Sequence, residues 1–194
     1  DCHVTAIEYD EKIAEVYQSF FPNDTVIIGD AHEYIRKNYN KFDFIWSSPP
    51  CQTHSSFRQN ICVRFRGSEP VYPDASLYQQ IEFLHANAEC DFVIENVKSY
   101  YKPWIEPTAT LQRHNFWSNF HISEKEFKKT NLRSQQIPDL QKHHGFDLTN
   151  IKIPNKRQIL RNCVEADVGK YILDLITEDT SQIDMFSQKA EGCA

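Results

Sequence analysis

Along the first half of the chain, short continuous apolar runs alternate with segments whose apolar residues recur at helical spacing. Short apolar runs at residues 4–8, 25–28 and 42–46 predict buried strands, because each is brief and rich in β-branched or aromatic side chains. Residues 11–20 and 31–38, which lie between them, carry apolar side chains at helical spacing. This strand–helix alternation predicts βαβ units and a parallel sheet, and so an α/β fold.

The pattern is weaker in the second half. Residues 74–87 predict a helix and residues 92–94 a buried strand, whereas residues 52–73 form a long loop of the kind that often serves as a functional lid. Beyond these we expect a strand at 116–122, little regular structure at 123–156, a helix end or turn at 157–162, a helix packed on the sheet at 167–176 and a loose tail from about 177.

Polar or reactive side chains follow four of the predicted strands. Glu8 and Asp30 end the first two, Cys51 follows the third after a Pro-Pro turn, and Glu95 ends the strand at 92–94. The carboxyl ends of parallel strands meet at one edge of a sheet, where ligands bind in open α/β folds. We therefore expect these four side chains to converge on a functional site.

Cys51 is the candidate nucleophile. Pro49 and Pro50 fix their φ angles and lack N–H donors, so the chain leaves the strand on a stiff turn that presents the thiol. The alternative is a buried structural cysteine, the usual state of a free thiol. Reactive thiols need a special electrostatic setting, which the pattern of residues does not reveal.

Composition places the chain among ordinary soluble domains. It has 194 residues, of which 40% are hydrophobic and 25% charged, and contains no apolar run near the roughly 20 residues of a membrane span and no evident signal peptide. Its six cysteines never form C-x-x-C, which argues against zinc ribbons and disulfide scaffolds and fits a reducing cytoplasm. The histidines show no ligand spacing; we expect His143 and His144 in a loop and no metal site.

Charge is distributed unevenly. The formal net charge is −6, yet residues 113–161 hold ten Lys or Arg against four Asp or Glu. A basic segment on an acidic body suggests contact with a polyanion. A solvated basic loop is the equally simple alternative.

Pro50-Cys51-Gln52 and Glu95-Asn96-Val97, each after a strand, resemble motifs of the DNA (cytosine-5)-methyltransferase family of bacteria and phages. The resemblance implies an α/β fold with the Rossmann-like sheet of S-adenosylmethionine-dependent methyltransferases and a small appended target-recognition region. It makes Cys51 the nucleophile that adds to carbon 6 of a flipped cytosine, and Glu95 the acid beside N3. Arg113 would hold O2, although Asn115 replaces the second arginine of the family's Gln-x-Arg-x-Arg motif.

The same resemblance implies S-adenosylmethionine as cofactor. The family's ribose-binding acid matches Glu8, its adenine-binding acid matches Asp30, and its closing Gly-Asn-x-Val motif matches Arg161-Asn162-Cys163-Val164. The family's Phe-x-Gly-x-Gly turn is absent from this sequence; we expect it in a longer chain, with supply by a partner or loss of cofactor binding as alternatives. The expected cofactor-binding residues are Glu8, Tyr9, Asp30, Ala31, Pro50 and Asn162.

Double-stranded DNA with a short target site is the implied partner of a monomeric, cytoplasmic enzyme of the DNA (cytosine-5-)-methyltransferase class. The expected organisation is a catalytic core at 1–118, a recognition region at 119–156, a return to the core at 157–178 and a tail at 179–194. The expected DNA-binding residues are Gln52, Ser55, Arg58, Arg64, Arg66, Lys128, Lys129 and Arg133.

Three other functions stay open. Ser48-Pro49-Pro50 also fits methyltransferases that act on amino groups of adenine or cytosine, but those place an aromatic residue where Cys51 stands. A cytosine-5 methyltransferase of the same fold that acts on tRNA is permitted by the acidic body and the small recognition region. A DNA-binding remnant of the same fold, without cofactor, would account for the absent glycine turn. The role in restriction, phage protection or regulation is equally open.

Overall fold

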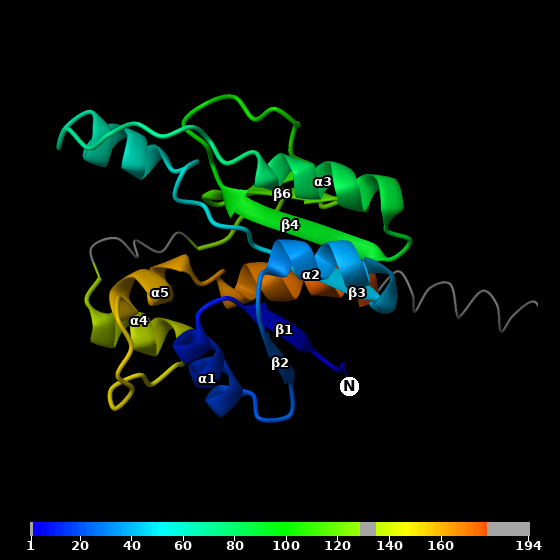
Figure 1. Ribbon diagram of the computed structural model, residues 1–194, viewed down its shortest axis with the longest axis horizontal. Helices are drawn as coiled ribbons and strands as arrows, with labels where there is room; N and C mark the ends of the chain where they lie inside the picture. The colour runs from blue at the N-terminus through cyan, green and yellow to red at the C-terminus, as the bar shows by residue number, and fades with distance from the viewer. Residues whose placement is uncertain (1, 129–134, 178–194) are drawn as a thin grey trace, which may run out of the picture. The chain divides into compact units, whose positions relative to one another are not determined.

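The computed structural model describes residues 2–128 and 135–177, which comprise a mixed arrangement of helices and strands (Figure 1). The chain divides into two compact units, each described by itself. The first unit combines Asp1–Ile45, Tyr72–Phe92 and Asn131–Asn162, and the second combines Trp46–Val71, Val93–Thr130 and Cys163–Ala194.

The first unit begins with the predicted βαβ arrangement. Strand β1 (Thr5–Glu8) leads into α1 (Glu11–Phe20), then β2 (Thr25–Ile28) and α2 (Ala31–Asn38). The two strands pair in parallel and lie side by side in Figure 1. Their parallel pairing confirms the prediction for this part of the chain.

Aspartates begin both of these helices. The side chain of Asp10 accepts hydrogen bonds from the N–H groups of Lys12 and Ile13, and Asp30 does the same for His32 and Glu33. Such caps satisfy backbone donors that would otherwise lack partners in the first helical turn. They fix the start of each helix directly after the carboxyl end of a strand.

Three further helices belong to the first unit. They are α3 (Ser76–Asn87), α4 (Ile137–His144) and α5 (Lys156–Asn162). Leu140, Leu148 and Leu160 form a buried cluster against which the partly buried Val16 and Phe20 of α1 pack. The apolar face of α1 is therefore covered by residues more than a hundred positions later in the sequence.

A second sheet contains β3 (Phe44–Ser47), β4 (Asp91–Val97), β5 (Ala109–Leu111) and β6 (His114–Ser118) in the order β3-β4-β6-β5. Strand β6 runs antiparallel to both β4 and β5. Every residue of β6 is buried. Burial on both faces is typical of a strand inside a covered sheet rather than one with a solvated side.

Several predictions about the second half were wrong. The four polar-ended strands lie in two sheets rather than one, because in the described residues β1 and β2 pair only with each other, whereas β3 and β4 belong to the sheet β3-β4-β6-β5. The strand expected at 116–122 lies at His114–Ser118, and α4 begins at Ile137 inside the segment expected to lack regular structure. His143 and His144 lie in the last turn of α4, where basic groups interact favourably with the helix dipole, and not in a loop.

The segment after the cysteine is more ordered than a plain loop. Residues Arg58–Val63 form a π-helical stretch in the second unit. It ends with backbone hydrogen bonds from Arg66 to Ile61 and from Gly67 to Val63, with Gly67 in the left-handed region at φ 70°. Residues 166–177 form the expected helix of the second unit, and the tail from 178 lies outside the described residues.

Candidate active site

The Cys51 turn is held to the end of β4. The Asn96 side chain, which is only 1% exposed, donates from Nδ2 to the Pro49 carbonyl at 2.9 Å. The His54 N–H donates to the Cys51 carbonyl at 3.1 Å, which closes the turn. The two proline φ angles and these two hydrogen bonds together place the thiol at a defined position beside β4.

Glu95 lies on β4 opposite Phe116 of β6, and its side chain is buried. Burial raises the pKa of this carboxyl to about 7, while a hydrogen bond with Ser48 and the charge of Arg113 oppose the rise. At neutral pH the carboxyl is therefore divided between its protonated and ionised forms. A group with this pKa can donate a proton at physiological pH.

The Cys51 thiol shares this electrostatic environment. Burial and the nearby Glu95 carboxylate raise its pKa, and the Arg113 guanidinium partly offsets both effects. Cys51, Glu95 and Arg113 therefore interact within the second unit, as the sequence predicts. The thiol is protonated at rest, so the thiolate has to form in the course of the reaction.

His114 is a neighbour of Glu95 that the sequence did not single out. Its Nε2 lies 3.5 Å from Oε1 of Glu95. Burial, helped by the charge of Arg113, lowers the pKa of His114 to about 4. Both partners are buried, and the imidazole is neutral at pH 7, so this contact is not an ion pair.

Arg113 occupies a tight turn between β5 and β6. Leu111 and His114 face each other at the ends of these strands, so Gln112 and Arg113 form the connection. Gln112 adopts a left-handed φ of 51°, and the Arg113 carbonyl accepts a hydrogen bond from the Lys98 N–H at 3.0 Å. Two-residue connections between antiparallel strands favour a positive φ at their first residue, as Gln112 has.

Arg113→Gln should raise the pKa values of both Cys51 and Glu95, because the guanidinium lowers both. We expect methyl transfer at pH 7 to fall by about tenfold to a hundredfold, because the variant loses the charge-assisted hydrogen bond that Arg113 is expected to donate to O2 of the cytosine. The pH–rate profile should move toward higher pH. Lys98→Gln, which removes an exposed neighbouring charge, is the matched control, and an unchanged profile in Arg113→Gln would contradict the assignment.

The expected cofactor residues of the first unit lie at the carboxyl edge of β1 and β2. Glu8 ends β1 and Asp30 follows the end of β2 by two residues; Tyr9 is 80% exposed and Ala31 is also exposed. One oxygen of each carboxylate accepts backbone N–H groups of the following turn, which fixes its orientation. Carboxylates at such an edge are suited to accept hydrogen bonds from ribose hydroxyls and an adenine amine.

The remaining two expected cofactor residues lie elsewhere. Asn162 is the exposed last residue of α5 in the first unit, and Pro50 is exposed beside Cys51 in the second.

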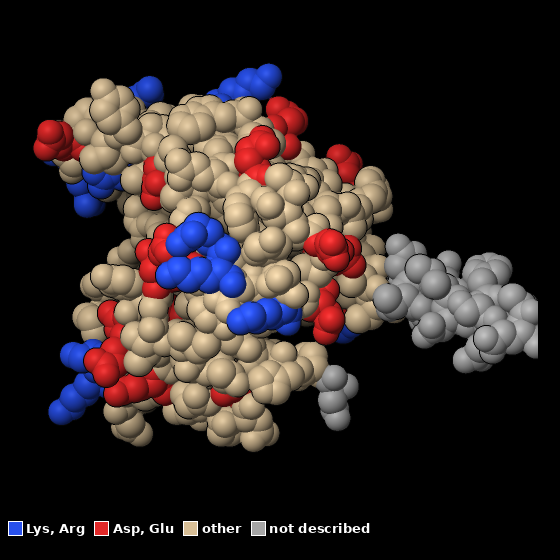
Figure 2. Space-filling model, turned by 45° about the vertical axis from the view of Figure 1, so that its right-hand side comes forward, with Lys and Arg blue, Asp and Glu red and all other residues tan. Residues whose placement is uncertain are grey.

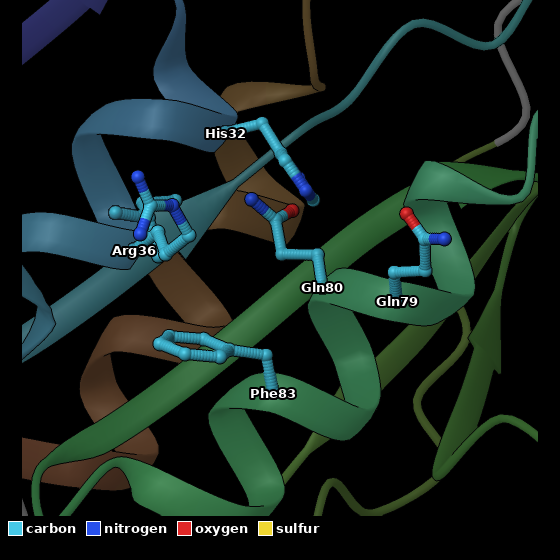
Figure 3. Close-up of a pocket in the computed structure, with 6 residues that line it drawn as sticks. His32, Arg36, Gln79, Gln80 and Phe83 are labelled. Atoms are coloured by element: carbon cyan, nitrogen blue, oxygen red, sulfur yellow. The ribbon is translucent and has the colours of Figure 1, made fainter.

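A cavity of about 150 Å³ opens between α2 and α3 of the first unit (Figure 3). Its lining includes His32, Arg36, Gln80 and Phe83, so an aromatic ring and polar groups face the same small space.

The expected DNA-binding residues are mostly at the surface. Gln52, Arg64, Arg66 and Lys128 are exposed, Ser55 and Arg58 are half-buried, and Lys129 and Arg133 lie outside the described residues. Arg58 donates to the Glu69 carbonyl at 3.3 Å, which braces the π-helical stretch. On the face shown in Figure 2, basic side chains form small groups mixed with acidic ones.

The sequence profile of the C-5 cytosine-specific DNA methylase family matches residues 2–108, more than half of the chain. The chain belongs to this family. C-5 cytosine-specific methylases transfer a methyl group from S-adenosylmethionine to cytosine in DNA, so the chain is a methyltransferase that acts on DNA. Comparison with curated proteins and with solved structures gave no match.

The described residues of this methylase bear on two further features, a metal site and a membrane-spanning helix. Across residues 2–128 and 135–177, no group of three or more His, Cys, Asp or Glu side chains is arranged to hold a metal ion. No helix in the same part of the chain is long and apolar enough to cross a membrane.

Sequence reasoning missed four side chains of the methylase site. Ser48 and His114 contact Glu95, Asn96 holds the cysteine turn, and His54 lies buried three residues after Cys51. Ser48 and Asn96 stand inside the recognised motifs, so their motif membership was a usable signal. His54 and His114 offered none, because their roles depend on contacts with residues distant in sequence.

Proposed function

We propose that this methylase transfers a methyl group to carbon 5 of a cytosine flipped out of duplex DNA, through a covalent adduct between Cys51 and carbon 6. The observation that carries this proposal is the pairing of a partly buried thiol with a buried carboxyl whose pKa is about 7. Neutral carboxyls of this kind are typical of sites that protonate a substrate.

The chemistry requires both groups. Carbon 5 of cytosine is a weak nucleophile, and attack of the Cys51 thiolate on carbon 6 changes that. As the sulfur–carbon bond forms, the electron pair of the C5–C6 double bond moves toward N3, which takes the proton held by Glu95. Carbon 5 is then enamine-like and would take the methyl group from the sulfonium, which leaves as a neutral thioether. Loss of the carbon 5 proton to water and of the thiolate restores the C5–C6 double bond and frees Cys51, and N3 returns its proton to Glu95.

S-adenosylmethionine, when bound, supplies an electrophilic methyl group on a sulfonium. Glu8 and Asp30 fit this group because a half-buried and an exposed carboxylate lie at or just after the carboxyl ends of two paired parallel strands. We propose that Glu8 accepts the ribose hydroxyls and that Asp30 and Ala31 contact the adenine. Tyr9, Pro50 and Asn162 complete the proposed cofactor set, in a Rossmann-like fold.

DNA contacts follow from the same proposal. A base inside a duplex is out of reach of Cys51, so it has to be flipped, at a cost of a few kcal/mol. The segment after Cys51, with Arg58, Arg64 and Arg66, is the proposed lid over the flipped base. Residues 119–156 are the proposed recognition region, with the core at 1–118 and the return at 157–178.

The decisive experiment supplies the protein with radiolabelled S-adenosylmethionine and either duplex DNA or tRNA, followed by identification of the modified base. We expect 5-methylcytosine in DNA. Label in tRNA alone, or N4-methylcytosine or N6-methyladenine as product, would replace the proposed function by one of its alternatives. DNA binding without transfer would indicate a binding remnant.

Arg64→Gln combined with Arg66→Gln tests the lid. Both arginines are exposed next to Phe65, which is 84% exposed. Loss of two phosphate contacts should weaken DNA binding uniformly across sequences and reduce the salt-dependence slope by about two. Lys12→Gln with Lys37→Gln, which removes two exposed charges from helices of the first unit, is the matched control in binding titrations at several salt concentrations. An unchanged slope in the arginine variant contradicts the proposed lid.

A further inference from the structure

A buried histidine paired with a half-buried tyrosine lies beside the cysteine turn and has no part in the proposed chemistry. His54 is 1% exposed, and its Nδ1 lies 2.5 Å from the hydroxyl of Tyr101. The two rings are also in contact, with centroids 6.0 Å apart. Burying the polar ring of His54 is costly unless it is hydrogen-bonded, so its contact with the half-buried Tyr101 stabilises one specific arrangement.

The backbone on either side of this pair is joined as well. The Tyr100 N–H donates to the His54 carbonyl at 3.1 Å, and Ser55 and Ser99 form an isolated antiparallel bridge. The Ser99 hydroxyl donates to the Tyr101 carbonyl at 2.6 Å. We name these contacts between residues 54–55 and 99–101 the His54–Tyr101 clasp.

The clasp closes a short path between the two catalytic segments. On one side, the His54 N–H bonds to the carbonyl of Cys51. On the other, Ser99 follows β4, which carries Glu95, by two residues. The clasp therefore connects the chain just after the thiol to the chain just after the carboxyl, in addition to the Asn96–Pro49 bond, which holds the chain just before the thiol.

We propose that the His54–Tyr101 clasp is a positioning device that fixes the cysteine turn relative to Glu95. This inference rests on the proposed function. Displacing a catalytic group by about 1 Å can cost on the order of a hundredfold in rate, because the reacting atoms then leave their attack geometry. His54 and Tyr101 act through Cys51 and Glu95, so they are positioning residues and not catalytic ones.

Tyr101→Phe tests the clasp with the smallest change, since it removes one hydroxyl and keeps the ring. We expect the single-turnover rate of methyl transfer, and the rate of adduct formation with 5-fluorocytosine DNA, to fall about tenfold. The dissociation constant for DNA should stay within about twofold. Tyr100→Phe, which removes a hydroxyl from the neighbouring, more exposed ring, is the matched control and should leave both rates unchanged.

Substitutions at His54 extend the test. His54→Leu should slow transfer at least as much as Tyr101→Phe, and the double variant should be no slower than His54→Leu alone, because both remove one interaction. His54→Asn, which keeps a polar group near the Nδ1 position, should recover part of the rate. Partial recovery is not expected of a residue that only fills space.

Two results would overturn the inference. The first is a wild-type rate in Tyr101→Phe; the second is a fall in rate matched by an equal loss of DNA affinity and thermal stability. Failure of the proposed function has a different signature, because the unmodified protein would then transfer no methyl group to cytosine in DNA.

Discussion

Cys51→Ser should reduce methyl transfer at least about a thousandfold. A serine hydroxyl does not ionise near neutral pH and adds poorly to carbon 6, so the covalent route closes. The turn itself should persist, because its hydrogen bonds use the Pro49 and Cys51 carbonyls and not the sulfur. DNA binding, measured by titration of a fluorescent duplex, should therefore change by less than about threefold.

Cys62→Ser is the matched control for this result. Cys62 lies in the π-helical stretch of the same unit and, like Cys51, is partly buried. It should retain wild-type transfer, and mass mapping of a 5-fluorocytosine adduct should locate the DNA on Cys51. An adduct on Cys62, or substantial transfer by Cys51→Ser, would assign the nucleophile to another residue.

Glu95→Gln should lower the transfer rate by about a hundredfold to ten-thousandfold, the usual contribution of a general acid. The amide is nearly the same size as the carboxyl and preserves packing against β6, but it has no proton to give to N3. In the unmodified protein the rate should fall as pH rises above about 7, because the Glu95 carboxyl then loses its proton. The variant should lack this dependence in single-turnover measurements.

Glu95→Gln, which should lower the transfer rate, should raise the free energy of unfolding at high pH. The folded-state pKa of Glu95 is about 7, against an ordinary value of 4.5. Below pH 4.5 the carboxyl is protonated in both the folded and the unfolded protein, and its contribution to stability is fully present. This contribution is lost as pH rises through 7, because the folded protein then buries a charge. A shift of this size corresponds to about 3 kcal/mol.

Glu95→Gln should therefore be more stable than the unmodified protein at pH 8, by up to about 3 kcal/mol, and similar to it near pH 4.5. Urea unfolding at the two pH values measures this difference. Glu89→Gln, which alters an exposed carboxylate just before the same strand, should show no such pH dependence. Equal stability of Glu95→Gln and the unmodified protein at pH 8 would show that Glu95 is not buried as a charge.

Local patterns predicted the N-terminal part of the first unit well. The bounds of α1, β2 and α2 agree with the apolar periodicity, since each has a clear period and a strong terminal signal such as the capping Asp30. Sheet order was not predictable in this way. That β4 lies between β3 and the antiparallel β6 depends on contacts between segments far apart in the sequence.

In the candidate site, too, local motifs were predictable, whereas properties that depend on distant contacts were not. Cys51 and Glu95 were found because each follows an apolar strand and stands in a recognisable motif. The pKa of about 7 at Glu95 could not be read from the sequence, because it depends on burial and on Ser48 and Arg113, which lie 47 and 18 residues away. Likewise, nothing near His54 in the sequence indicates Tyr101 as its partner.

The packing of α1 affects how the protein is made. Its apolar residues Val16 and Phe20 meet Leu140 and Leu160, so this contact has to wait until the later segment has left the ribosome. At about 5–20 residues per second, that delay is on the order of ten seconds. During this interval the nascent N-terminal helix presents an uncovered apolar stripe, which is the kind of surface that chaperones bind during translation.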